Sequence, residues 1–88
     1  MKTIWKYQLV IQDSQPLTMP KGAEILTVQV QNNIPCIWAL VDPNAEIEHR
    51  EFCMFGTGHD FGLIDYKYIG TFQIHEGLLA FHLFESNI

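Results

Sequence analysis

Positive charge is scarce in this sequence. Its 88 residues include five basic side chains, one of them Arg, against ten acidic ones, so the formal net charge is −5. Affinity for nucleic acid comes largely from neutralising phosphates with Lys and Arg. This composition therefore argues against a nucleic-acid partner, and a basic protein surface is a more natural partner for such an acidic chain.

Cysteine is rare too, and no apolar run is long. Cys36 and Cys53 lie inside apolar runs without CxxC spacing, so we expect two buried free thiols, no disulfide framework, no metal site and no cofactor. No apolar run approaches the roughly twenty residues that span a bilayer, so we expect no membrane partner. Residues 1–5 enter a strand pattern without the features of a signal peptide, which predicts a cytoplasmic protein.

The apolar stripe of an amphipathic helix is also absent. Instead, apolar and polar residues alternate from residue 3 to residue 85, in short runs broken by Pro, Gly, Asn and Asp. A period of two is typical of strands, and the length fits one domain over residues 1–88. We predict an all-β fold, a small antiparallel β-barrel or sandwich of six to seven strands, with room for a short helix after Phe61.

One predicted strand, residues 36–41, is apolar on both faces. It pairs with residues 25–31 across either a two-residue or a four-residue loop, and both registers give the same core face. That face holds Leu26, Val28, Val30, Ile37, Ala39 and Val41. Trp38 and Leu40 lie on the opposite face. Two interpretations stay open: these two residues form an interface with a second copy or another partner, or a folded-over barrel covers Trp38 from within.

The clearest hairpin pattern lies near the carboxyl end. Residues 67–75 and 78–85 alternate around Glu76-Gly77, which favours a tight turn and places Thr71 opposite His82. The core face of this predicted hairpin comprises Tyr68, Gly70, Phe72, Ile74, Leu79, Phe81 and Leu83.

A glycine-rich segment, residues 56–62, is the first candidate for ligand binding. Glycines let backbone N–H groups turn toward an anion, and a histidine beside them adds a donor. Gly56, Thr57, Gly58 and His59 are therefore candidate ligands of a phosphate or carboxylate. The alternative is a tight turn that needs two glycines for its dihedral angles.

Catalytic chemistry has weaker support. His59 or His82 could act as a general acid or base, but no Ser or Cys lies in a glycine-rich elbow, so we assign no catalytic residue. Glu46, Glu48 and Arg50 are interpreted as an exposed charge pattern that discourages pairing between sheet edges.

Several runs resemble a family of short uncharacterised proteins found in phages and mobile elements, a domain of unknown function. The runs are residues 19–31 (MPKGAEILTVQVQ), 35–43 (PCIWALVDP), 56–59 (GTGH), 68–72 (YIGTF) and 80–85 (AFHLFE). The resemblance covers nearly the whole chain, and residues 61–67 look less like the family pattern. It implies a phage or prophage protein in the cytoplasm of a host bacterium.

The leading hypothesis is a non-enzymatic binding protein that acts on a host component, for example as an inhibitor of a bacterial defence system. It would dock on a host protein through Trp38 and Leu40 or hold a small phosphorylated ligand at Gly56–His59, and we expect a homo-oligomer. The alternatives are a small enzyme with a histidine general acid or base and a structural virion component.

Overall fold

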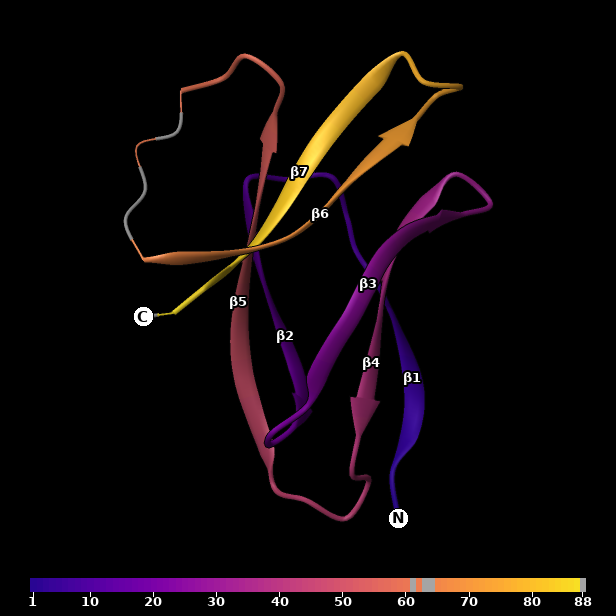
Figure 1. The fold of residues 1–88 in the computed structure, drawn as a ribbon, viewed down its shortest axis with the longest axis vertical. Helices are drawn as coiled ribbons and strands as arrows, with labels where there is room; N and C mark the ends of the chain where they lie inside the picture. The colour runs from indigo at the N-terminus through magenta and orange to yellow at the C-terminus, as the bar shows by residue number, and fades with distance from the viewer. Residues whose placement is uncertain (61, 63–64, 88) are drawn as a thin grey trace.

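The computed structural model describes residues 1–60, 62 and 65–87 and is an all-β sandwich (Figure 1). One antiparallel sheet, sheet A, has the strand order β1-β4-β3, and the other, sheet B, has the order β2-β5-β7-β6. The strands are β1 (Thr3–Gln8), β2 (Ser14–Pro20), β3 (Glu24–Gln31), β4 (Ile34–Val41), β5 (Ile47–Gly56), β6 (Tyr66–Ile74) and β7 (Leu79–Ser86). The sheets do not close into a barrel, so the sandwich alternative is the one confirmed.

Helices are absent from the described part of the chain. Consequently, none of these residues forms a helix long and apolar enough to cross a membrane. The short helix expected after Phe61 falls on positions 61, 63 and 64, which lie outside the described residues.

The core lies between the inner faces of the two sheets. Strand β4 contributes Ile37, Ala39 and Val41, each at most 1% exposed, which confirms the core face predicted for this strand. Sheet B contributes a second apolar layer: Met19, Phe52, Met54, Phe72, Ile74 and Leu83. Cys36 and Cys53 are buried free thiols, as expected.

Two β-bulges correct the predicted faces. The register of β3 against β4 shifts between Ile25 and Thr27, and that of β6 against β7 shifts between Tyr68 and Gly70. A bulge adds one residue to a strand, so the alternation before it no longer matches the alternation after it. Leu26 and Tyr68 were predicted to face the core, and this was wrong: they are 44% and 55% exposed. The predicted pair Thr71 and His82 does lie opposite one another.

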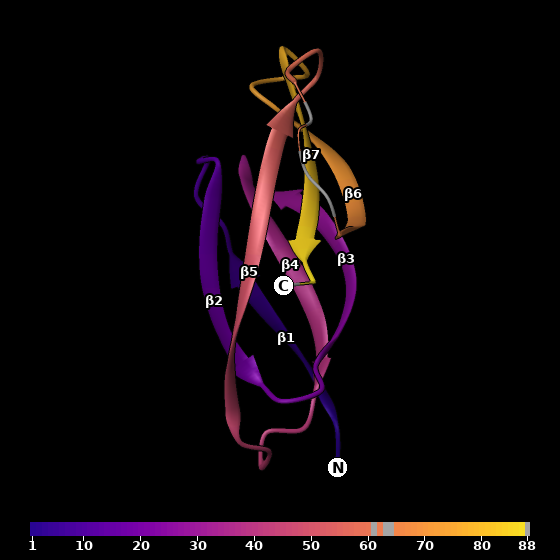
Figure 2. The same cartoon turned by 90° about the vertical axis from the view of Figure 1, so that its left-hand side faces the viewer.

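The edge strands β3 and β6 lie against each other on one side of the sandwich (Figure 2). Their approach is close at Gly70, where a Cβ atom would come within 2.8 Å of Val28 Cγ1. Only glycine fits at this distance without displacement of Val28. The two bulged edges therefore cover each other.

Gln15 closes part of the opposite side, where the chain passes from β1 to β2. Its side chain is 5% exposed, and its carboxamide bonds both backbone groups of Val10. The Val10 N–H donates to Gln15 Oε1 at 3.1 Å, and Gln15 Nε2 donates to the Val10 carbonyl at 2.7 Å. The carboxamide thus replaces a neighbouring strand at this position.

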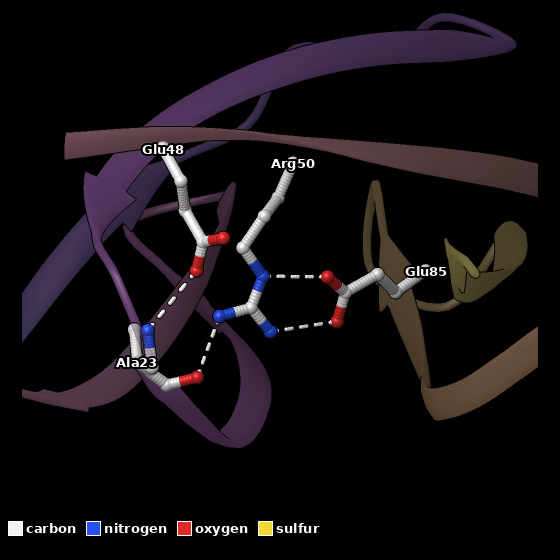
Figure 3. Close-up of polar contacts among 5 residues, drawn as sticks. Ala23, Glu48, Arg50 and Glu85 are labelled. Atoms are coloured by element: carbon white, nitrogen blue, oxygen red, sulfur yellow. Dashed lines mark hydrogen bonds and ion pairs between the residues drawn. The ribbon is translucent and has the colours of Figure 1, made fainter. Parts of the chain in front are cut away.

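Arg50 links three parts of the chain inside the sandwich (Figure 3). Its Nε and Nη2 donate to the two Glu85 carboxylate oxygens at 2.6 and 2.8 Å, and its Nη1 donates to the Ala23 carbonyl at 2.5 Å. The side chains of Arg50 and Glu85 are 17% and 13% exposed. The hydrogen bond to Glu85 raises the pKa of Arg50.

This arrangement differs from the exposed charge pattern expected for the start of β5. Arg50 and Glu48 share the inner face with Phe52, because alternate residues of a strand face the same side. The Gly22 N–H donates to Glu48 Oε2 at 3.0 Å, so this carboxylate fixes the turn between β2 and β3. The two side chains fasten β5 to its surroundings rather than repel an approaching strand.

We predict that Gln15→Leu lowers the free energy of unfolding by about 2 kcal/mol, because it removes both hydrogen bonds between the buried Gln15 carboxamide and the Val10 backbone, each worth about 1 kcal/mol. Gln12→Leu is the matched control, since Gln12 is exposed and bonds only the Ser14 carbonyl within the described contacts. Urea denaturation measures both variants. Equal changes in the two variants would contradict the role assigned to Gln15.

Tyr7 supports a prediction about pH. Its hydroxyl is buried, has no hydrogen-bond partner in the described structure, and has a pKa raised above 10.0 by burial, an effect that Arg50 partly offsets. The unfolded chain therefore loses this proton first, so the protein should lose stability as pH rises through 10. Tyr7→Phe should add up to about 1 kcal/mol at neutral pH and reduce the alkaline loss. Thermal unfolding across alkaline pH tests this, and an unchanged profile in Tyr7→Phe would contradict it.

Candidate functional site

The glycine-rich segment after β5 begins with a tight turn. The His59 N–H donates to the Gly56 carbonyl at 3.1 Å, and Gly58 has a φ of +87°. A Cβ at position 56 would lie 2.8 Å from Cε1 of the His59 ring. The turn thus needs Gly58 for its backbone angle, and a side chain at position 56 would require the exposed His59 ring to move.

A chain of hydrogen bonds fastens this turn to the outer face of sheet B. Thr57 Oγ1 lies 2.7 Å from His82 Nε2, and His82 Nδ1 lies 2.9 Å from Thr71 Oγ1. The Tyr68 hydroxyl continues the chain to Thr71 Oγ1 at 2.6 Å. The bulge that turns Tyr68 outward places it at the end of this network.

The network has part of the geometry of a catalytic site. A hydroxyl beside an imidazole whose second nitrogen is held by another group is the arrangement that activates a nucleophile. Here a threonine hydroxyl holds the second nitrogen, and no carboxylate takes part in the hydrogen bonds that the structure shows for His82. The arrangement orients the imidazole, and it lacks the negative charge that would stabilise an imidazolium.

His59 lies between two open pockets. The first, of about 440 Å³, is lined by Asp13, Ser14, Cys53, Met54, Phe55, His59, Asp60 and Tyr66. The second, of about 420 Å³, lies toward the β6–β7 turn and is lined by Gly56, Thr57, His59, Gly77, Leu78, Leu79, Ala80 and Phe81. In the first pocket, a hydrogen bond to Cys53 raises the pKa of Tyr66.

Two hydrogen-bonding groups of this turn that could bind an anion already have partners within the protein. The His59 N–H is bonded to Gly56, and the Thr57 hydroxyl is bonded to His82. Asp13 and Asp60 line the first pocket, and their negative charge opposes a phosphate there. Binding of a phosphate or carboxylate by residues 56–59 stays a prediction.

Trp38 and Leu40 lie on the other sheet, on the outer face of sheet A. Trp38 has Lys6 and Thr27 as its direct neighbours on the adjacent strands, and Leu40 has Ile4 and Glu24. Both side chains are half-buried, and Ile4 is 55% exposed. Trp38 is therefore not enclosed by the chain, and the two sets of predicted site residues occupy different sheets.

The described residues hold no group of three or more His, Cys, Asp or Glu side chains placed to bind a metal ion. The backbone N–H of His75 donates to Asn33 Oδ1 at 3.1 Å. This bond joins the β6–β7 turn to the β3–β4 turn, where Asn32 and Asn33 have positive φ values.

Sequence reasoning missed the roles of three residues: Gln15 and Arg50 in the fold, and Thr71 in the network around His82. Gln15 precedes Pro16 in a segment that resembles a surface turn, and no periodicity marks its amide as buried. Arg50 has its main partner 35 residues away. The hydrogen bond between Thr71 and His82 could have been predicted, because the predicted hairpin already placed the two residues opposite each other.

The chain was compared with family models, curated proteins and solved structures. The model described as "Domain of unknown function (DUF7352)" matches residues 1–88. The searches of curated proteins and of solved structures find no significant match. Because the model spans the whole chain, this protein belongs to the DUF7352 family, a domain of unknown function.

Proposed function

We propose that this chain is a non-enzymatic binding protein of a phage or prophage that docks on a host protein. The observation that carries the proposal is the outer face of sheet A, where Trp38 and Leu40 are half-buried and Ile4 is exposed. A tryptophan on a sheet face that its own chain covers only in part is a common anchor of protein interfaces. Docking requires no catalytic group.

The charges of the chain indicate the chemistry of the partner. The net charge is −5, and the face itself carries one cation, Lys6, and one carboxylate, Glu24, beside the apolar residues. Lys6 Nζ donates to Gln31 Oε1 at 2.7 Å, so part of its hydrogen-bonding capacity is used within the face. An apolar patch with a basic rim on the host protein fits this surface.

Protein docking is better supported than capture of a small phosphorylated ligand. The donors of the glycine-rich turn are partly occupied, and carboxylates line the adjacent pocket. An inhibitor of a bacterial defence system is a concrete form of the proposal, because covering a host surface is enough to block it. The proposed site of action is the host cytoplasm.

The proposal predicts a host protein that crosslinks at the outer face of sheet A. A photo-crosslinking residue at position 40 should capture it, and one at position 78 should not, because Leu78 is 84% exposed but lies in the β6–β7 turn. The captured protein is then purified and titrated by calorimetry. Trp38→Ala should weaken binding about thirtyfold, and added salt should weaken it further.

Leu78→Ala is the matched control, since it removes an exposed apolar side chain outside the face. It should change the dissociation constant less than twofold, within roughly 0.4 kcal/mol. Equal capture at positions 40 and 78, or equal losses in Trp38→Ala and Leu78→Ala, would show that the docking surface lies elsewhere.

A further inference from the structure

We infer that the free edge of β1 pairs with β1 of a second copy, antiparallel and in register at Trp5, so that two copies of sheet A join into one continuous sheet. This inference does not depend on the proposed host partner. It rests on the state of the sheet edges, on the backbone groups left free along β1, and on the exposure of its apolar side chains.

Three of the four sheet edges carry features that prevent strand addition. Edge strands β3 and β6 contain bulges and lie against each other. Along β2, the Asp13 carbonyl and the Lys21 N–H form their hydrogen bonds on the side of β5, so the odd-numbered residues of this strand direct their backbone groups toward β5. The even-numbered residues, which include Pro16 and Pro20, therefore direct theirs toward the free edge. Bulges and prolines are the usual protection of an edge. Strand β1 has neither.

The free backbone groups of β1 can be identified from one hydrogen bond. The Leu9 N–H donates to the Pro35 carbonyl of β4 at 2.9 Å. Because alternate residues of a strand bond to the same side, Tyr7 and Trp5 also bond to β4. Ile4, Lys6 and Gln8 therefore direct their N–H and C=O groups to the free edge, and the next such residue, Val10, is already paired with Gln15.

Exposed apolar side chains also lie on this strand, one on each of its faces. Ile4 is 55% exposed on the outer face, and Trp5 is 40% exposed on the inner face. In Figure 1, β1 runs along the margin of the molecule farthest from β5. The one basic side chain of β1, Lys6, bonds Gln31 of β3 and so extends across its own sheet. It gives the edge little of the protection that an outward lysine provides.

The residues of β1 select one register for a second copy. Pairing Ile4 with Lys6 of the partner places Trp5 opposite Trp5 in a non-hydrogen-bonded pair, where side chains come closest. Shifting the pairing by two residues in one direction sets Lys6 opposite Lys6. The opposite shift sets Lys6 opposite Lys2, so both shifts bring like charges together. A further shift would need the backbone groups of Val10 to pair with the second copy, and these groups are already bonded to the Gln15 carboxamide.

The residues of β1 thus fit a second copy of this chain as the strand that pairs with its free edge. The chosen register pairs two exposed tryptophans, sets no like charges opposite each other, and ends where the free edge ends. The twofold axis runs perpendicular to the sheet, so residues keep their faces across the interface. The outer faces that carry Trp38 and Leu40 then lie on the same side of the joined sheet.

A pair of charge variants at one exposed position tests both the interface and its register. In this register Ile4 lies opposite Lys6 of the partner, so Ile4→Glu creates two attractive pairs and Ile4→Lys creates two repulsive ones. We expect Ile4→Glu to tighten the dimer about fivefold and Ile4→Lys to weaken it about fivefold. Sedimentation equilibrium of the full chain at concentrations up to about 1 mM measures the dissociation constants.

Ile47→Glu and Ile47→Lys are the controls for net charge, because Ile47 is 63% exposed and lies on β5 in the other sheet. Extra negative charge alone should weaken association between acidic copies, so tighter association of Ile4→Glu separates the local pair from the overall charge. A monomer throughout the concentration range overturns the inference. A dimer that responds equally to changes at positions 4 and 47 also overturns it.

Discussion

The constraint on which the rest of this structure depends is the closure of sheet edges. Two small sheets that do not form a barrel have four edges, each with unpaired backbone groups. In the described structure, β3 and β6 cover each other, β2 carries two prolines, and Gln15 occupies the last free position after β1. On β1, the backbone groups of Ile4, Lys6 and Gln8 face an open edge.

Inside the sandwich, the contacts of Arg50 hold the strands of sheet B in place. Strand β5 bonds β2 along one part of its length and β7 along another, and Arg50 holds this junction through Glu85 and the Ala23 carbonyl. A bidentate ion pair with little exposure costs desolvation, which its hydrogen bonds offset. Replacing either Arg50 or Glu85 by an uncharged residue would leave the charge of the other without its partner inside the sandwich. The pair therefore links β5 to β7 within sheet B, and the bond to the Ala23 carbonyl ties β5 to the connection between β2 and β3.

Alternation was enough to predict the fold class, the core face of β4 and the pairing of Thr71 with His82, because each depends only on a period of two. It was not enough where a strand contains an extra residue. Nothing in the composition around Leu26 or Ile69 marks a bulge, and each bulge reversed the predicted face of one residue. The carboxamide of Gln15 and the guanidinium of Arg50 were missed because their partners lie in other segments, and periodicity contains no information on partners.

The candidate site was predictable to a similar extent. The glycine-rich turn and the outward direction of Trp38 follow from local sequence, whereas the bond between Thr57 and His82 depends on the register of β5 against β7. The two candidate surfaces lie on different sheets, and only sheet A also has an open edge. For this reason, the face with Trp38 and the edge of β1 form one continuous region of the molecule.

Amide hydrogen exchange at individual residues of β1, measured at low and high protein concentration, tests this account most directly. The amides of Trp5 and Tyr7, bonded to β4, should be protected at every concentration. Those of Ile4 and Lys6 should exchange rapidly in dilute solution and become protected as concentration rises. Rapid exchange of Ile4 and Lys6 at all concentrations would show that the β1 edge remains open and would contradict the account.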